Sequence, residues 1–281
     1  MILIADSGST KTSWRLIDNA GKIAEFQTSG INPFYQSTEN IRQELQQHLK
    51  PQTDNYDIKH IYFYGAGCHF DDKKQIVRSA MQSIFENSVI EINNDLLGAA
   101  RALFGREKGI ACILGTGSNS CFYDGREIKE NVSPLGFILG DEGSGAVLGK
   151  RLVADVLKNQ LSEGLKNKFL TQYNLTTAEI LDKVYKQPFP NRFLAQFAVF
   201  LYENSHHKPI YNIIYKSFED FFMRNVMQYD YKHNRVAFVG SIAHYFNDIL
   251  SAVAMDLNIN ISTIAQSPMN GLQQYHQSEN F

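Results

Sequence analysis

The chain is poor in cysteine and has no long apolar run. Its 281 residues include three cysteines, Cys68, Cys112 and Cys121, and their spacing matches no zinc or iron–sulfur pattern. The last two lie in apolar, strand-like runs, which favours buried and unreactive thiols. No stretch approaches the roughly 20 apolar residues of a membrane span, and Met1–Ala5 is too short for a signal peptide. We therefore expect a cytoplasmic protein that needs no disulfide and contacts no membrane.

The sequence also lacks an excess of basic residues. Lysine and arginine total 27, aspartate and glutamate total 29, and the net charge is −2. A dedicated nucleic-acid-binding protein normally carries a basic excess, so we expect no nucleic-acid partner. A phosphate group could still be bound locally by a metal ion and backbone N–H groups. A chain of this length is typical of about two globular domains.

One pattern occurs twice along the chain. An apolar strand, a turn of small residues, a second strand and an acidic turn follow one another over residues 2–18 and again over residues 110–124. The two small-residue turns, at Gly8 and Gly115, lie 107 residues apart, and the two acidic turns lie 106 apart. The near-constant offset favours a duplicated domain, although two unrelated hairpins could show the same order.

Hydrophobic periodicity gives the remaining elements. We expect strands at 22–26, 58–64, 88–92, 235–239 and 259–264, and helices at 41–49, 71–85 and 96–104, through most of 141–234, and from 240 to about 256. These patterns predict an α/β protein with an N-terminal domain of residues 1–107, against which a final helix at 268–281 packs. The second domain, residues 108–267, carries a helical insertion.

The two commonest nucleotide-binding fingerprints are missing. Lys150 follows Gly149, but Arg151 occupies the position that a Walker A loop gives to Ser or Thr, and no G-x-G-x-x-G motif occurs. The hairpin turns, Gly8–Lys11 and Gly115–Ser118, offer a different device because their backbone N–H groups and hydroxyls can face an anion. Either one alone could be a structural turn that binds no ligand. Together, in duplicated positions, they predict a clamp on the phosphates of one nucleotide.

Four acidic residues stand where packing does not require them. Asp6 follows the first apolar strand and could cap its own turn or bind Mg²⁺. Asp95 joins a strand to a helix and could be a helix N-cap, a chemically active group or both. Asp141 and Glu142 lie among four glycines between residues 136 and 145, which indicates a ligand site more readily than a packing role.

Several of these runs together resemble one family. Ile113–Asn119, followed by Gly140–Ser144, looks like the N-acetylglucosamine kinases of the BadF/BadG/BcrA/BcrD-type ATPase family, within the actin, sugar-kinase and heat-shock-chaperone ATPase superfamily. Asp6–Lys11 resembles the first phosphate motif of that family, and Val239–Ala243 resembles its adenosine motif. The resemblance covers nearly the whole chain in the right order. It implies two duplicated actin-like (ribonuclease H-like) domains around an inter-domain cleft.

The resemblance also implies an ATP site with Mg²⁺. Thr10 and Thr116 would contact the phosphates, Asp6 would organise Mg²⁺, and Gly240 would lie against the adenosine. The other residues of these motifs that we assign to the ATP site are Gly8, Ser9, Lys11, Gly115, Gly117 and Ser241.

For the second substrate, the resemblance implies an amino sugar, with N-acetylglucosamine expected and its 6-phosphate as the product. Asp95 matches the aspartate proposed as catalytic base, and it would also contact the sugar. Asn32 matches the asparagine that binds the sugar. The further sugar contacts that we assign are Ser118, Asn119, Gly136, Asp141 and Glu142.

This chain departs from the family pattern in ways that concern the substrate. The animal enzymes carry Gly-Gly-Trp-Gly before the acidic motif, whereas residues 133–136 here are Ser-Pro-Leu-Gly, and Ser7 and Ser9 stand where Gly is frequent. Leu135 in place of Trp bears on the sugar more than on the reaction. Cys68 does not supply the cysteines that the iron–sulfur activators of the family need. An ATPase without a small acceptor and a sugar sensor without turnover stay open as alternatives, and a homodimer is one expected assembly.

Overall fold

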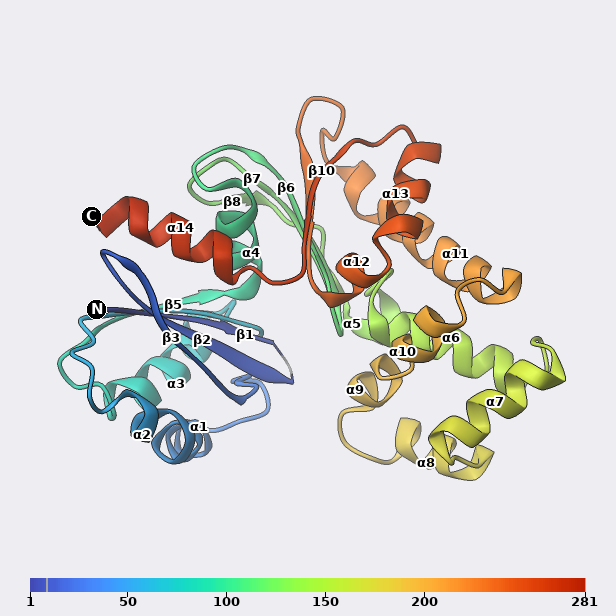
Figure 1. The fold of residues 1–281 in the computed structure, drawn as a ribbon, viewed down its shortest axis with the longest axis horizontal. Coiled ribbons are helices and arrows are strands. Elements are labelled where there is room, and N and C mark those ends of the chain that lie inside the picture. Colours follow the sequence, from blue (N-terminus) through green and yellow to red (C-terminus); the bar gives the residue numbers. More distant parts are fainter. Residues whose placement is uncertain (9, 281) are drawn as a thin grey trace. The chain divides into compact units, whose positions relative to one another are not determined.

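The computed structural model describes residues 1–8 and 10–280, which form two five-stranded sheets with surrounding helices (Figure 1). The strands are β1 (Ile2–Ser7), β2 (Lys11–Asp18), β3 (Gly21–Ser29), β4 (His60–Gly65), β5 (Val89–Asn94), β6 (Gly109–Leu114), β7 (Ser118–Tyr123), β8 (Ile128–Glu130), β9 (Val236–Val239) and β10 (Ile261–Ala265). The helices are α1 (Thr38–Glu44), η1 (Leu45–Leu49), α2 (Lys50–Thr53), α3 (Asp71–Gln82), α4 (Asp95–Phe104), α5 (Gly136–Leu139), α6 (Gly145–Leu157), α7 (Glu163–Tyr173), α8 (Thr177–Tyr185), α9 (Pro190–Ala195), α10 (Ala198–Glu203), α11 (Lys208–Arg224), η2 (Val226–Gln228), α12 (Ser241–Tyr245), α13 (Asn247–Asp256) and α14 (Met269–Asn280).

The chain separates into two compact units. The first unit holds residues 1–108, 123–128 and the C-terminal segment from Ser267, and the second holds residues 109–122 and 129–266. None of the helices in the described part of the chain is long and apolar enough to cross a membrane.

The two sheets have the same strand order. The first runs β3-β2-β1-β4-β5, and the second runs β8-β7-β6-β9-β10. In the first sheet β1 pairs antiparallel with β2 and parallel with β4, which pairs parallel with β5. In the second, β6 pairs parallel with β9, and β9 pairs parallel with β10. Matching order and matching parallel strands confirm the duplication that the two hairpins predict.

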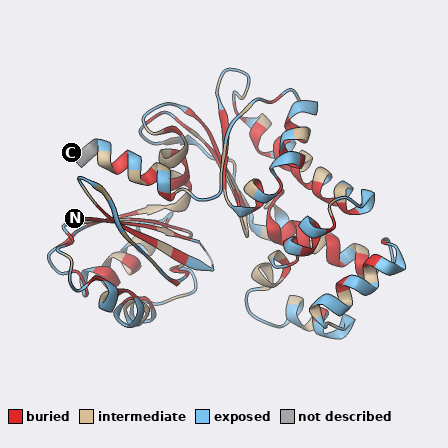
Figure 2. Ribbon diagram, viewed as in Figure 1, coloured by how far each residue is buried: buried red, intermediate tan, exposed pale blue. Residues whose placement is uncertain are grey.

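Strand alternation divides the apolar residues of the first sheet between its two faces. Leu3 and Ala5 of β1 pack with buried residues of α1 and α3, whereas Ile2 and Ile4 pack with Leu272 of α14. Figure 1 shows α1 and α3 on one face of this sheet and α14 on the other. Strand β1 is therefore covered on both faces, which Figure 2 shows as a buried central strand.

The last helix, α14, is fixed to the first unit by both packing and hydrogen bonds. A Cβ atom at Gly271 would lie 2.0 Å from the carbonyl oxygen of Ala102 in α4, so only glycine permits this approach. Arg15 of β2 donates from Nη1 to Asn270 Oδ1 at 2.8 Å and to Gln273 Oε1 at 3.0 Å.

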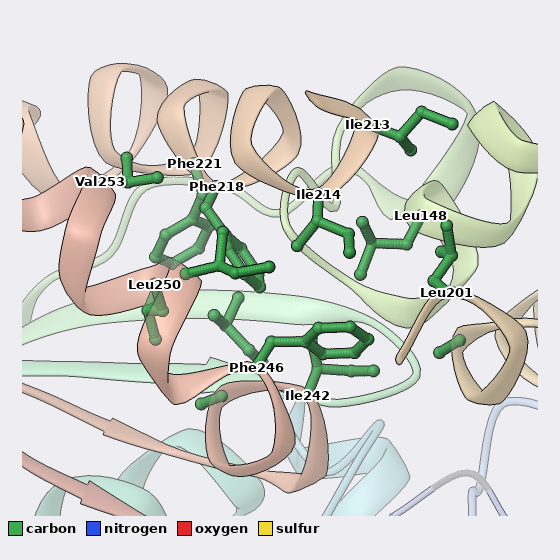
Figure 3. Packing of buried hydrophobic residues seen from close by; sticks show 14 of the residues in the cluster. Leu148, Leu201, Ile213, Ile214, Phe218, Phe221, Ile242, Phe246, Leu250 and Val253 are labelled. Atoms are coloured by element: carbon green, nitrogen blue, oxygen red, sulfur yellow. The ribbon is translucent and has the colours of Figure 1, made fainter. Parts of the chain in front are cut away.

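The core of the second unit lies between its sheet and the helices α6, α10, α11, α12 and α13. Figure 3 shows the labelled side chains converging on one apolar cluster. Phe218 and Phe221 come from α11, Leu148 from α6, and Leu250 and Val253 from α13. All five are fully buried, as the helical spacing of apolar residues through this region predicts.

The sequence-based elements are confirmed with two kinds of difference. Strand β8 was not expected, and it is three residues long with two of them exposed; helix α7, inside the expected helical region, buries only Leu165 and Phe169. Neither therefore shows a strong periodic signal. The helix expected at 41–49 extends over 38–53 and contains a π-helical turn, η1. Cys112 and Cys121 are buried free thiols, as expected.

Candidate functional site

In the first unit, the residues of interest gather where three parallel strands end. The register aligns Ser7 of β1 with Gly65 of β4, and Gly65 with Asn94 of β5. Asp6, on β1, and Asp95, directly after β5, therefore lie at the same carboxyl edge of the sheet, on either side of β4. This is the edge at which open α/β sheets bind their ligands.

Both Asp6 and Asp95 have raised pKa values, and the charge of Asp95 contributes to the shift of Asp6. Burial and, second to it, the charge of the Asp95 carboxylate raise the pKa of Asp6 to about 7, against the opposing effect of the Lys11 ammonium. Burial also raises the pKa of Asp95, while the backbone N–H group of Leu96 stabilises its charged form. Two carboxyl groups with raised pKa values at a ligand-binding edge are typical of a functional site.

Helix α4 shows that Asp95 is not an N-cap. The cap is Asn94, which has extended backbone angles and whose Oδ1 accepts from Leu97 N–H at 2.7 Å. Asp95 is the first helical residue, and its Oδ1 accepts from Leu96 N–H at 3.0 Å. Since Asn94 caps the helix, the interpretation of Asp95 as an N-cap is wrong. N-capping therefore does not account for the Asp95 carboxylate.

Asn32 is held rigidly beside Gly67. Its backbone N–H donates to Gln36 Oε1 at 2.7 Å, and its Oδ1 accepts from Phe34 N–H at 3.0 Å. Gly67 has φ +80°, and a Cβ atom there would lie 2.3 Å from Asn32 Oδ1. With Oδ1 engaged in this way, Asn32 has its amide Nδ2 to offer a ligand.

The first hairpin turn joins β1 to β2. Gly8 N–H donates to the Lys11 carbonyl at 3.0 Å, and Gly30 N–H donates to the Thr10 carbonyl at 3.1 Å. Gly8, Thr10 and Lys11 are exposed. Ser9, the remaining residue of this predicted phosphate contact, lies outside the described residues.

The second hairpin turn, Gly115–Gly117, is fixed by the start of helix α6. Gly145 N–H donates to the Gly115 carbonyl at 2.8 Å, and Ala146 N–H donates to the Thr116 carbonyl at 3.1 Å. The free N–H groups of a helix N-terminus often bind anions, but these two are engaged with the turn. Gly240 also lies close to this turn, because a Cβ atom there would lie 2.3 Å from the carbonyl oxygen of Leu114, the residue before Gly115. Ser241 follows it as the exposed first residue of α12.

Asp141 has a backbone conformation that is rare for a residue with a side chain. Its φ is +54°, and such left-handed residues persist only where their surroundings enforce them. Its N–H donates to the Pro134 carbonyl at 3.0 Å, and its own carbonyl accepts from Ser144 N–H at 3.1 Å. Its carboxylate faces the second turn, where Ser118 N–H binds it and Gly117 leaves room for it. Burial nevertheless raises the pKa of Asp141 to about 6.

The neighbouring acid, Glu142, points to a different partner. Its Oε1 lies 2.7 Å from Arg224 Nε, and its Oε2 accepts from Asn225 Nδ2 at 3.4 Å. The structure therefore separates the two acids: Asp141 faces the glycine turn, and Glu142 faces the end of α11.

Two further predicted sugar contacts lie near Asp141 in the second unit. Asn119 Oδ1 accepts from Ser120 N–H and from Asn131 Nδ2, both at 2.9 Å. Gly136 begins the short helix α5 and has φ +72°. Lys150 Nζ donates to the Phe137 carbonyl at 2.6 Å and so holds α5 against α6.

No group of three or more His, Cys, Asp or Glu side chains among residues 1–8 and 10–280 could form a metal cage. Mg²⁺ does not require one, because it commonly uses one or two carboxylates together with water and substrate phosphates. A cation at Asp6 would offset both its desolvation and the charge of Asp95. Asp6 therefore fits a magnesium ligand of this kind.

Comparison with known proteins decides the family. Residues 5–267 match the sequence profile of the BadF/BadG/BcrA/BcrD ATPase family. The chain belongs to this family. A crystal structure from Porphyromonas gingivalis, of a protein provisionally named an N-acetylglucosamine kinase, is 47% identical to this chain over the full length of both chains, with a TM-score of 0.97.

More distant relatives give the fold and one partial sequence match. A ROK family glucokinase from Streptomyces griseus shares the fold at 13% identity and a TM-score of 0.63, over 98% of this chain and 97% of that one. The glucosamine kinase GspK of Vibrio cholerae is 32% identical over 107 residues, which span 38% of this chain and 35% of that relative. This BadF-type chain thus has the actin-like fold that sugar kinases share.

Several residues that shape the site gave little or no signal in the sequence. Gly67 follows a buried strand in a Gly-Ala-Gly run, and that run could have suggested a tight approach. Arg224 and Asn225 lie more than 80 residues from Glu142 at the end of an ordinary amphipathic helix. Only the tertiary structure brings them to the acidic motif.

Proposed function

We propose that this protein transfers the γ-phosphoryl group of ATP to a hydroxyl group of an amino sugar. We take N-acetylglucosamine as the preferred acceptor and N-acetylglucosamine 6-phosphate as the product. The observation that carries the proposal is the pair of half-buried carboxylates, Asp6 and Asp95, at one sheet edge. The names of the P. gingivalis and V. cholerae relatives support an amino sugar as the substrate class.

In this proposal Asp95 accepts the proton of the attacking hydroxyl group. A general base is most effective when its pKa approaches the working pH, and burial moves the pKa of Asp95 in that direction. The bond from Leu96 N–H keeps the carboxylate oriented. Asp6 would hold Mg²⁺, which, when bound, neutralises charge on the transferring phosphoryl group.

The two glycine turns would bind ATP. Thr10 and Thr116 offer hydroxyl groups, and the Gly115–Gly117 turn is pre-shaped by its bonds to α6, so binding requires little ordering. Gly240 would lie against the adenosine, and glycine is required there because a side chain would meet the Leu114 backbone.

Asn32 and Asp141 would bind the sugar hydroxyl groups, with Ser118 and Asn119 beside Asp141. Asn32 offers an amide donor and Asp141 a carboxylate acceptor, so each can pair with a hydroxyl group. A site built on such polar groups rejects analogues that leave them unpaired.

Replacing Gly67 with Ala tests the role of Asn32. The new Cβ would collide with Asn32 Oδ1 and would have an unfavourable φ, so the amide must move. We expect the apparent KM for the sugar to rise at least about tenfold, the loss typical of one hydrogen bond in a polar site, with the KM for Mg-ATP unchanged. Gly164→Ala in α7, where no atom lies within 4 Å of the new Cβ, is the matched control. An unchanged sugar KM would show that Asn32 does not bind the sugar.

A coupled assay of ADP release tests the function itself. We expect ADP release to depend on added sugar, with a higher kcat/KM for N-acetylglucosamine than for glucosamine or glucose. Equal or better turnover of either alternative would contradict the proposed acceptor. Release without sugar would instead favour an ATPase or activator, and sugar binding without release would favour a sensor.

A further inference from the structure

We propose that Glu142 and Arg224 form a positioning pair that holds the Asp141 carboxylate in place for the sugar. This inference rests on the proposed kinase function. It assigns Glu142 a role through its neighbour instead of direct contact with the substrate, and it adds Arg224, which no motif indicates.

The backbone of Asp141 is strained. A non-glycine residue at φ +54° relaxes to negative φ unless its neighbours prevent it. The Gly140 side of Asp141 is fixed, because a Cβ atom at Gly140 would lie 2.1 Å from the Pro134 carbonyl oxygen and Asp141 N–H donates to that same carbonyl.

The backbone that follows Asp141 is anchored against α11. Gly143 has φ +73°, and a Cβ atom there would lie 3.1 Å from Phe221 Cβ and 3.2 Å from Leu114 Cδ2. The backbone is therefore pressed against α11 at this point. Between Gly143 and Asp141, the Glu142 side chain reaches Arg224 and Asn225 at the end of the same helix.

Glu142 and Arg224 carry opposite charges and contact each other. The Glu142 side chain is 14% exposed, and Arg224 is its cationic partner at 2.7 Å. Hydrogen bonds to charged groups are the stronger class of protein hydrogen bond. If Arg224 is removed, Glu142 loses its main partner and can turn toward solvent, which frees the peptide that holds Asp141 in its left-handed conformation. The Asp141 carboxylate would then leave Ser118 N–H.

The decisive variant is Arg224→Ala. Arg224 is the last residue of α11 and its side chain is 64% exposed, so alanine preserves the helix. We expect the apparent KM for N-acetylglucosamine to rise about tenfold, with kcat within threefold and the KM for Mg-ATP unchanged. Arg224→Lys, which keeps a cation, should recover part of the loss. Glu142→Gln should resemble Arg224→Ala. The sugar KM of the double variant should be no higher than that of the worse single variant, because both substitutions break the same Glu142–Arg224 pair.

Lys216→Ala is the matched control. Lys216 lies on the same helix and pairs with Glu219 and Asp220 instead, so its loss should leave the sugar KM unchanged. An unchanged sugar KM in Arg224→Ala would overturn the inference. So would a parallel fall in kcat, in both substrate affinities and in thermal stability, because that pattern indicates general loss of packing. Wild-type protein without sugar-dependent ADP release would instead refute the proposed function, and that result is visible before any variant is compared.

Discussion

Replacing Asp95 with Asn is expected to lower kcat by about 10²–10⁴-fold, the usual contribution of a positioned general base. Asparagine has almost the same shape but cannot accept a proton at neutral pH. The helix should be unaffected, because its cap is Asn94 and an asparagine Oδ1 at position 95 can still accept from Leu96 N–H. Steady-state assays at saturating sugar and Mg-ATP measure the effect.

The chain offers a close control in Asp71→Asn. Asp71 is likewise the first residue of a helix in the first unit, but its side chain is fully exposed, so kcat should stay at the wild-type value. If Asp95→Asn keeps more than about a tenth of wild-type kcat, the base lies elsewhere and Asp141 is the next candidate. If Mg-ATP binding collapses instead, Asp95 is a metal ligand and its role must be exchanged with that of Asp6.

The second large effect concerns stability against acid. His276 of α14 is fully buried, stacks on Tyr62 with ring centroids 3.8 Å apart, and has Nε2 2.8 Å from Tyr64 Oη. Arg101 donates to that same Tyr64 oxygen at 2.8 Å, so the Tyr64 hydroxyl proton is directed to His276 Nε2, which must then be unprotonated. Burial, with the charges of Arg101 and Arg106 adding to it, lowers the pKa of His276 from 6.5 to about 3.

Proton linkage gives the direction in which the free energy of unfolding changes with pH. The unfolded chain binds a proton at His276 below about pH 6.5 and the folded chain does not until about pH 3, so the stabilising contribution is complete above pH 6.5 and is lost as pH falls toward 3. At roughly 1.4 kcal/mol per pH unit, the free energy of unfolding should fall by about 2 kcal/mol between pH 6.5 and 4.5 from this group alone.

His276→Gln removes this dependence while keeping an acceptor for Tyr64. The difference in unfolding free energy between wild type and variant should therefore shrink as pH falls from 6.5 to 4.5. Trp14 is the single tryptophan and is 1% exposed in the core of the first unit, so its fluorescence during urea unfolding reports on this unit. His233→Gln, at an exposed histidine of the second unit, serves as the control. A difference that does not change with pH would show that His276 does not titrate in this way.

The features of the fold and of the candidate site that the sequence predicts are those encoded by residues close together in the chain. The hairpins at Gly8 and Gly115 repeat at a nearly constant offset, and that local pattern predicts the duplication. The sequence does not show whether residue 94 or residue 95 caps α4, because Asn and Asp cap helices equally well. The extended backbone of Asn94 identifies it as the cap. The pairing of Glu142 with Arg224 depends on where α11 ends in space, which no short-range pattern encodes.

The position of α14 has a consequence for synthesis on the ribosome. The face of β1 formed by Ile2 and Ile4 is synthesised some 265 residues before its cover, Met269 and Leu272. At about 5–20 residues per second, the nascent first sheet waits roughly ten to fifty seconds with an apolar face uncovered. During that time it offers a binding surface to chaperones or to neighbouring nascent chains, and the first unit completes its fold only when α14 has emerged.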